Sequence, residues 1–286
     1  MLETKLSPVI SRLFRYAPLK GLDRFGGDKN LYISGFARSG NSWISYLFAY
    51  CLNIPCYDLD GDGTSYTRER EGLRKYLSGD NAHRKSQRFD RVLKTHAVPS
   101  ILPLSNEDSV IYIVRDGRDV ITSYYFHIMK QWMLSNELKR RIIIRIFNSI
   151  FPQKIRLGLI AQILGYEWSR ETCQVIDQGW PFVRYEDMKT DVFGTIQRVM
   201  NQIDPETWDP EVASNAIKIF SFGNMQKEAR KFAHDSHSTR KGIVGDWYNH
   251  FSPSIHRSFI KRYGFALEHF DYVTDTKEYQ KRMNLK

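Results

Sequence analysis

The stretch Leu31–Trp43, LYISGFARSGNSW, decides how this chain folds. Its apolar beginning is typical of a buried β-strand, which we expect within Asp28–Phe36. A turn rich in glycine and serine follows the strand. Apolar residues then recur at helical spacing: Ile44, Leu47, Phe48 and Cys51. The stretch therefore predicts a strand, a loop and a helix in succession.

The same order of elements recurs further along the chain. The apolar run Val110–Val114 leads into the polar turn Arg115–Asp119 and then into a second helical pattern. Shorter apolar runs at Arg91–Lys94 and Phe182–Tyr185 predict two more strands. Apolar strands that alternate with helices favour an α/β fold, with a central parallel sheet flanked by helices. No repeat or linker marks a boundary, so we expect a single domain over residues 1–286.

The composition excludes a disordered or fibrous protein, because 42% hydrophobic and 14% aromatic residues supply a large core. A net charge of +10 indicates an anionic partner: nucleic acid, a membrane surface or a phosphorylated small molecule. Cys51, Cys56 and Cys173 form no CxxC pair, which argues against a disulfide framework or a zinc ribbon. The sequence shows neither a signal-peptide pattern nor an unbroken apolar run of about 20 residues, so we expect a cytoplasmic protein.

The loop Gly35–Ser42, GFARSGNS, has the spacing of a nucleotide-binding P-loop, except that Asn41 stands where that loop needs lysine. Glycines let backbone N–H groups approach phosphate oxygens, and the N-terminus of the following helix favours an anion. Arg38 supplies a cation inside the loop. The alternative is an ordinary tight turn with a solvated arginine.

Sites in parallel sheets lie beyond the carboxyl ends of the strands. That rule selects residues at four predicted strand ends: Gly35–Ser42, Thr95–His96, Arg115 and Tyr185. They combine a phosphate loop, a candidate base, a cation and an aromatic hydroxyl, which predicts a site that handles an anion.

Five motifs stand in order over roughly residues 31–270: Arg38–Trp43, Lys94–His96, Tyr112–His127, Tyr185–Met188, and Arg240–Gly242 with Gly245–Trp247. In these motifs the sequence resembles the nucleotide-dependent sulfotransferases, closest to their cytosolic branch. That family uses 3′-phosphoadenosine 5′-phosphosulfate (PAPS) as its sulfuryl donor. The first motif is similar to the family's 5′-phosphosulfate loop, the second to its catalytic strand end and the third to its 3′-phosphate motif.

The resemblance implies which residues hold the donor. The 5′-phosphosulfate would contact Arg38, Ser39, Gly40, Asn41 and Ser42. The 3′-phosphate would contact Arg115, Ser123, Arg240, Lys241 and Gly242. The adenine would pack against Trp43, Tyr185 and Phe222. Arginine suits phosphate because its guanidinium offers a fork of donors. The alternatives are core packing for Tyr185 and Phe222, and surface charge pairs of Arg115 and Arg118 with Asp116 and Asp119.

The resemblance also implies the catalytic residues. His96 would be the general base that takes the acceptor proton. Lys94 and Arg38 would stabilise charge on the transferring group and on the leaving phosphate. Cytosolic members usually have lysine at the position of Arg38, and because arginine does not give up its proton it would stabilise the leaving group without protonating it. No cluster of acidic residues has metal-ligand spacing, so we expect no required metal.

Two segments depart from the family. Residues 248–257 lack its dimerisation residues, so we do not expect family-style dimerisation. Residues 130–165 fall where the family is variable and contributes to the acceptor pocket and its lid. Isoleucines alternate there with arginines in a basic amphipathic pattern: Ile142, Ile146 and Ile150 with Arg140, Arg141 and Arg145.

This pattern has two interpretations. One is a pocket for a lipid or sterol-like hydroxyl compound, with membrane contact that also involves the basic amphipathic segment 1–27, where Leu6–Phe14 has helical spacing. The other is a helix that packs on its own domain and exposes a solvated basic face.

We therefore expect an enzyme that moves a sulfuryl group from PAPS to a hydroxyl or amine acceptor, releases adenosine 3′,5′-bisphosphate and has no nucleic-acid partner. One alternative is a P-loop kinase, which Asn41 in place of lysine disfavours. Another is a non-catalytic basic module for anionic lipid or nucleic acid, in which His96 and Trp43 would have no purpose.

Overall fold

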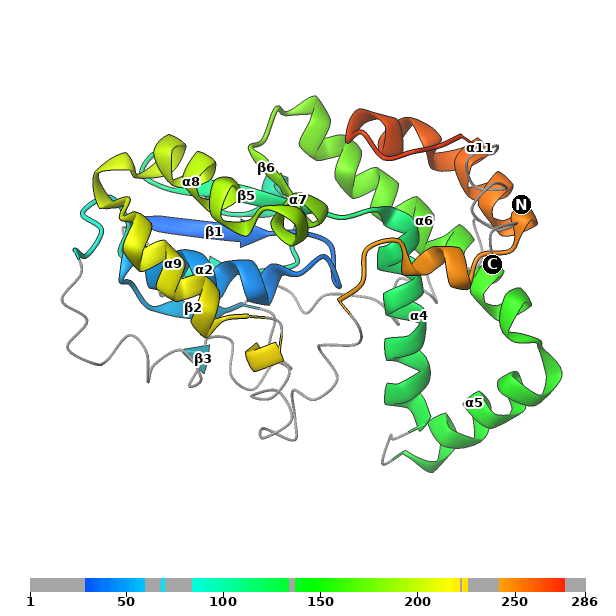
Figure 1. Ribbon diagram of the computed structural model, residues 1–286. Helices are drawn as coiled ribbons and strands as arrows, with labels where there is room; N and C mark the ends of the chain where they lie inside the picture. Colours follow the sequence, from blue (N-terminus) through cyan, green and yellow to red (C-terminus); the bar gives the residue numbers. More distant parts are fainter. Residues whose placement is uncertain are drawn as a thin grey trace. The chain divides into compact units, whose positions relative to one another are not determined.

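The computed structural model describes residues 29–59, 68–69, 84–133, 137–221, 223–225 and 242–275 (Figure 1). These residues divide into two compact units. The sheet unit holds the described residues up to Val114 and those from Gln174 to residue 225. The helical unit holds Arg115–Cys173 and the residues from 242 onward, again within the described ranges. The single domain expected from the sequence stays a prediction.

The sheet unit is built on a six-stranded sheet in the order β3-β2-β4-β1-β5-β6. The strands are β1 (Asn30–Ser34), β2 (Cys56–Asp58), β3 (Arg68–Glu69), β4 (Arg91–Lys94), β5 (Ser109–Val114) and β6 (Phe182–Arg184). All neighbours are parallel except β2 and β3, which are antiparallel. The predicted α/β fold with a parallel sheet is confirmed. One boundary differs, because Tyr185 begins a helix instead of ending a strand.

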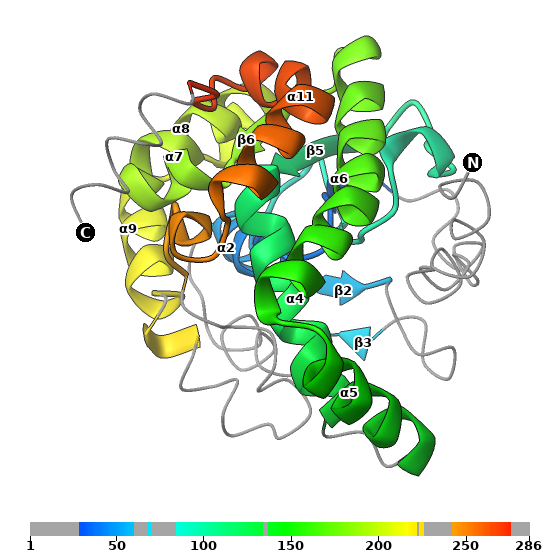
Figure 2. The ribbon, with the colours of Figure 1, turned by 90° about the vertical axis from the view of Figure 1, so that its right-hand side faces the viewer.

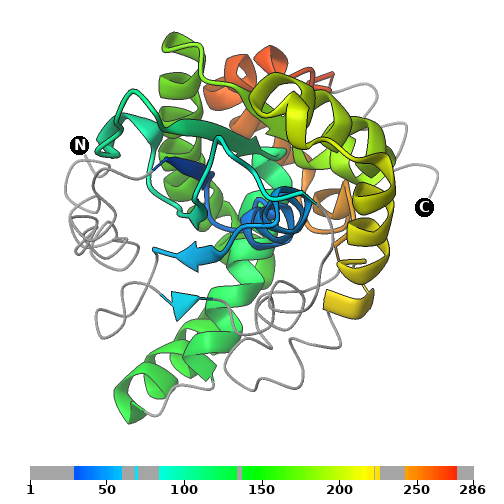
Figure 3. The same ribbon diagram turned by 90° about the vertical axis from the view of Figure 1, so that its left-hand side faces the viewer.

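Among the described residues, the sheet unit also contains helices and 3₁₀ turns: α2 (Asn41–Leu52), α7 (Tyr185–Thr190), α8 (Val192–Ile203), α9 (Pro210–Ile219), η2 (Pro99–Ile101) and η3 (Pro205–Thr207). Side chains alternate along β1, so Leu31 and Ile33 face one core while Tyr32 faces another. The first core packs α2, α8 and α9 against one face of the sheet (Figure 3). This packing fixes the carboxyl end of β1 against the start of α2.

The helical unit contains α4 (Gly117–Met133), α5 (Leu138–Ile150), most of α6 (Gln153–Asp177), η4 (Asp246–Asn249) and α11 (Pro253–His269). The predicted turn Arg115–Asp119 is shorter than expected, because α4 begins at Gly117. Gly117 leaves no room for a side chain, since a Cβ there would lie 2.7 Å from the Trp168 ring. The segment 130–165 forms the end of α4, all of α5 and the start of α6 (Figure 2).

In the part of the chain that the structure describes, no helix is both long and apolar enough to span a membrane. The predicted N-terminal helix around Leu6–Phe14, within the basic segment 1–27, lies outside the described residues.

Candidate active site

The phosphate loop lies between the last residue of β1, Ser34, and the first residue of α2, Asn41. Two of its residues adopt left-handed backbone angles, Arg38 with φ of 77° and Gly40 with φ of 102°. At Gly40 a side chain is excluded, because a Cβ would lie 2.7 Å from the Tyr185 ring. A left-handed arginine is strained, and strain of this kind is found at functional loops that the surrounding structure holds in place.

The start of α2 is left open to an anion. Its N-cap residue, Gly40, offers no side-chain cap, and the first turn has no acidic residue. The buried hydroxyl of Ser39 has no hydrogen-bond partner among the described residues. An unpaired buried donor beside an uncapped helix N-terminus suits a phosphate or sulfate oxygen.

Asn41 connects this loop to the end of β4. Its Nδ2 donates to the carbonyl oxygens of Gly35 (2.7 Å) and Thr95 (3.1 Å), and it also lies 3.1 Å from Nδ1 of His96. The P-loop lysine position is therefore occupied by an amide that joins two strand ends.

The tautomer of His96 follows from these contacts. Nδ1 of His96 lies 2.9 Å from the carbonyl oxygen of Gly35, which can only accept a hydrogen bond. Both amide hydrogens of Asn41 already have carbonyl partners. Nδ1 therefore carries the proton in the neutral ring, and Nε2 carries the lone pair. A half-buried neutral imidazole in this tautomer can accept a proton at Nε2.

Lys94 lies two residues before His96, at the end of β4. Its Nζ is 3.1 Å from Oδ1 of Asp58, the last residue of the neighbouring strand β2. Both side chains are largely buried, at 6% and 18% exposed. Asp58 is a functional candidate that the sequence interpretation missed, since a three-residue strand is too short for periodicity to reveal. Parallel register places Asp58 and Lys94 side by side.

Two of the residues predicted to contact the adenine, Trp43 and Tyr185, form an aromatic pair beside the loop. The rings of Trp43 and Tyr185 meet edge to face, with centroids 6.1 Å apart. Trp43 Nε1 donates to the carbonyl of Phe220 at 2.9 Å, which fixes the indole. Tyr185 is buried against Gly40. The structure thus brings two of the three predicted residues together, and Phe222 lies outside the described residues.

The helical unit carries the residues predicted to bind the 3′-phosphate. Arg115 is buried, donates to the carbonyl of Ile243 at 3.1 Å and lies 3.8 Å from Oδ2 of Asp119. Ser123 is buried one helical turn beyond Asp119, on the same face of α4. Gly242, next to Ile243, has a left-handed φ of 63°. Arg240 and Lys241 lie outside the described residues.

Asp119 anchors the segment that follows Gly242. Its carboxylate accepts hydrogen bonds from the backbone N–H groups of Gly245 (2.7 Å) and Trp247 (2.9 Å). Burial raises the pKa of Asp119 to about 6, although Arg115 and both N–H donors favour the charged form. The sequence interpretation treated Asp119 only as a charge partner. The structure gives it a positioning role.

Arg118 is a structural residue. It forms a bidentate pair with Asp116, at 2.6–3.2 Å, and its guanidinium lies 3.9 Å from the centre of the Trp247 ring. The alternative predicted from the sequence is that Arg115 and Arg118 form surface charge pairs. The structure shows both pairs, Arg118–Asp116 and Arg115–Asp119, but they are buried.

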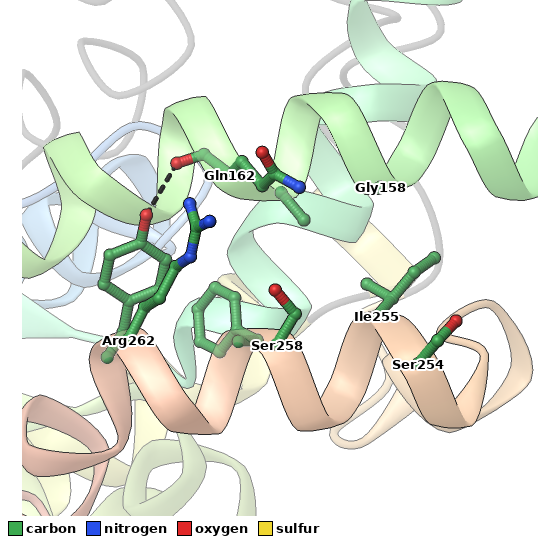
Figure 4. Close-up of a pocket in the computed structure, with 9 residues that line it drawn as sticks. Gly158, Gln162, Ser254, Ile255, Ser258 and Arg262 are labelled. Carbon is green, nitrogen blue, oxygen red and sulfur yellow. Dashed lines mark hydrogen bonds between the residues drawn. The ribbon is translucent and has the colours of Figure 1, made fainter. Parts of the chain in front are cut away.

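A hollow of about 200 Å³ lies between α6 and α11 (Figure 4). Small residues such as Gly158 and Ser258 line the space, and Tyr263, also in its lining, donates from its hydroxyl to the carbonyl of Gln162 at 2.7 Å. None of the predicted catalytic or donor-binding residues lines it. Among the described residues, no group of three or more metal-ligating side chains is found.

The structure has an α/β fold in which a strand–loop–helix unit with an uncapped helix N-terminus lies beside a strand that ends next to a histidine. Residues 28–274 match the model of the sulfotransferase domain, so this chain belongs to the sulfotransferase family. The enzyme class predicted from the sequence is thereby confirmed.

Curated relatives agree with this assignment, and solved structures share the fold. Sulfotransferase 1E1 of mouse is 24% identical over 255 residues, covering 82% of each chain. Sulfotransferase 1E1 of guinea pig is 27% identical over 256 residues, covering 82% of this chain and 81% of the relative. Among solved structures, mouse sulfotransferase SULT7A1 complexed with PAP has a TM-score of 0.57 at 20% identity, covering 92% and 93% of the two chains. Retinol dehydratase with retinol and PAP has a TM-score of 0.55 at 18% identity, covering 86% of this chain and 82% of that one.

Proposed function

We propose that this enzyme transfers a sulfuryl group from PAPS to a hydroxyl or amine of its acceptor. The observation that carries the proposal is the Asn41 bridge, which joins the anion-binding loop to the end of β4 by hydrogen bonds to Gly35 and Thr95, next to His96. The unpaired Ser39 hydroxyl and the uncapped start of α2 fit the phosphosulfate. The two similar solved structures were determined with PAP, the desulfated product, which supports this choice of donor.

His96 is the general base of the proposed reaction. Nε2 takes the proton from the acceptor hydroxyl or amine while the acceptor atom forms a bond to sulfur. The bond between sulfur and the bridging phosphate oxygen breaks in line with this attack, and its electron pair leaves with adenosine 3′,5′-bisphosphate. Activity should therefore fall at acid pH, where Nε2 is already protonated.

Lys94 and Arg38 provide the positive charge. Lys94 is held by Asp58 at the end of β4, and Arg38 lies within the loop that follows β1. Fixed cations stabilise the negative charge that develops on the transferring group and on the leaving oxygens. Arg38→Lys should keep much of the activity, whereas Arg38→Ala should lose it.

The helical unit supplies the 3′-phosphate contacts in this proposal. Arg115 and Ser123 come from the beginning of α4, and Gly242, Arg240 and Lys241 from the C-terminal motif. The Asp119 anchor holds residues 245–247 beside Arg115, which keeps the neighbouring Gly242 close to that guanidinium.

Thermal denaturation with nucleotides tests the donor. Adenosine 3′,5′-bisphosphate should raise the melting temperature, whereas AMP should raise it less and ATP with magnesium no more than AMP. Arg115→Ala should lose the bisphosphate-specific part of this shift. An equal or larger shift with ATP and magnesium would instead support the P-loop kinase.

Turnover tests the base independently. His96→Ala should bind the bisphosphate as wild type does, yet lose most of its turnover with labelled PAPS. Near wild-type turnover would remove His96 from the mechanism. If no nucleotide shifts the melting temperature, a non-catalytic basic module becomes the better explanation.

The proposal also covers the cellular compartment, the acceptor and the oligomeric state of the enzyme. The three cysteines are thiols, which suits a cytoplasmic enzyme. The acceptor pocket is assigned to the parts of residues 130–165 outside the exposed isoleucines of α5, and the expected acceptor is a lipid or sterol-like compound. Residues 248–257 lack the family's dimerisation residues, so we expect no family-style dimer through them.

A further inference from the structure

Helix α5 exposes its apolar side chains. We call five of them the α5 face, with exposed fractions of 46% to 62%: Leu138, Ile142, Ile143, Ile146 and Ile150. Ile144 alone among the helix's aliphatic side chains is buried, at 1% exposed. Within the helical unit α5 contacts α4 (Figure 2).

This orientation is the reverse of that in an ordinary surface helix, which turns its apolar stripe toward the core. Helix α5 contacts α4 and exposes Lys139 and Arg145, so the interpretation of 130–165 as a helix that packs on its own domain with a solvated basic face stays a prediction. Three apolar side chains that follow α5 in the sequence are exposed as well: Phe151, Ile155 and Leu159. Exposed apolar side chains gathered on one side of a helix mark a surface that binds another apolar surface.

From Leu138 onward the charges along α5 are all of one sign, and the acidic residue nearest to the helix is its N-cap, Glu137. Residues 138–166 contain six basic residues and no acidic residue: Lys139, Arg140, Arg141, Arg145, Lys154 and Arg156. Lys139 and Arg145 are exposed on α5 beside the isoleucines. A second copy of this helix would bring like charges together. Anionic lipid offers negative headgroups for the basic residues and a hydrocarbon layer for the isoleucines.

We propose that α5 and the first turns of α6 lie flat on a membrane surface that contains anionic lipid. The isoleucines of the α5 face enter the boundary between headgroups and acyl chains, and the basic side chains contact the headgroups. This interaction is independent of the sulfuryl transfer proposed above. It brings the enzyme to a surface where hydroxyl-bearing lipids are concentrated.

Vesicle sedimentation of the full chain tests this surface. Vesicles of phosphatidylcholine with 30% phosphatidylserine should sediment the wild type at low salt, and pure phosphatidylcholine should sediment it far less. The triple variant Ile142→Ser, Ile146→Ser, Ile150→Ser should partition at least about tenfold more weakly. The double variant Lys139→Ala, Arg145→Ala should bind the anionic vesicles about 25-fold more weakly than wild type, because each lost charge weakens binding about fivefold. Ile101→Ser is the matched control, because Ile101 is equally exposed but belongs to the sheet unit.

The outcomes separate the possible occupants of the α5 face. The proposal fails if wild type does not sediment, or if the triple variant sediments as wild type does. A dimer of the wild type that the triple variant abolishes would assign the face to a second copy. A triple variant that melts more than about 5 °C lower would assign it to a segment of this chain. The bisphosphate thermal shift, measured on the same samples, reports on the donor site and does not depend on vesicle binding.

Discussion

Acid should destabilise this protein through His256. This residue lies in the first turns of α11, is 1% exposed and stacks on Trp247 with ring centroids 5.1 Å apart and planes 9° apart. Burial lowers the pKa of His256 from 6.5 to about 4, and the positive charge of Arg118 acts in the same direction. Arg257 also lowers the pKa, whereas Asp116 raises it.

The sign and size of the effect follow from proton linkage. Between about pH 4 and 6.5 the unfolded state binds the proton and the folded state does not, so stability rises with pH in this range. The stabilisation is complete above pH 6.5 and is lost as the pH falls to about 4. A pKa difference of about 2.5, at about 1.36 kcal/mol per pH unit, gives up to about 3 kcal/mol.

The measurement is urea unfolding of wild type and His256→Phe at several pH values between 4 and 7. Phenylalanine keeps the flat ring against Trp247 but does not titrate. Asp119 also titrates here, since its pKa is raised to about 6, and its contribution has the opposite sign. The difference between the two proteins therefore isolates His256. If the free energies of unfolding of the two proteins change in parallel over this range, the reasoning is refuted.

Three further predictions concern the loop and its neighbours. Gly40→Ala should destabilise the fold by about 1–3 kcal/mol and remove the bisphosphate thermal shift, because the new Cβ would lie 2.7 Å from Tyr185 at a left-handed φ; an unchanged shift would contradict this. Asp58→Asn should lower kcat on the order of tenfold with little change in the KM for PAPS, since Lys94 loses the charge that orients it; steady-state kinetics decide this. Asn41→Ala should cost about 1–3 kcal/mol in urea unfolding, because the carbonyls of Gly35 and Thr95 each lose one hydrogen bond and Gly35 keeps only the bond from His96. Equal stability would contradict the bridge.

The sequence was sufficient to predict those elements whose pattern lies within one continuous segment of the chain. The strand–loop–helix units at 31–51 and 110–125 could be predicted because continuous apolar runs and helical spacing do not depend on distant residues. The loop residues Arg38–Ser42 carry their chemistry in adjacent positions. Predicted boundaries erred where a helix begins directly after a strand, as at Tyr185, because an aromatic residue is also typical of a strand and so extends the apparent apolar run.

Tertiary contacts decided what the sequence could not. The pairing of Lys94 with Asp58 arises from the parallel register of β4 and β2, which are separated by more than thirty residues of chain. Asp119 reaches Gly245 and Trp247 across a sequence separation of 126 and 128. The α5 isoleucines point outward because the opposite side of the helix packs on α4. The sequence shows that the helix has an apolar side, but it does not show whether that side faces the protein or the solvent.

The sequence by itself determined the kinds of groups in the site and the order of elements that carry them, because motifs and periodicity are local properties of the chain. Only the tertiary structure decided the proton position on His96, the partner of Lys94 and the surface that α5 presents, because each depends on atoms supplied by separate segments. Hydrogen-bond geometry and burial are properties of the packed molecule.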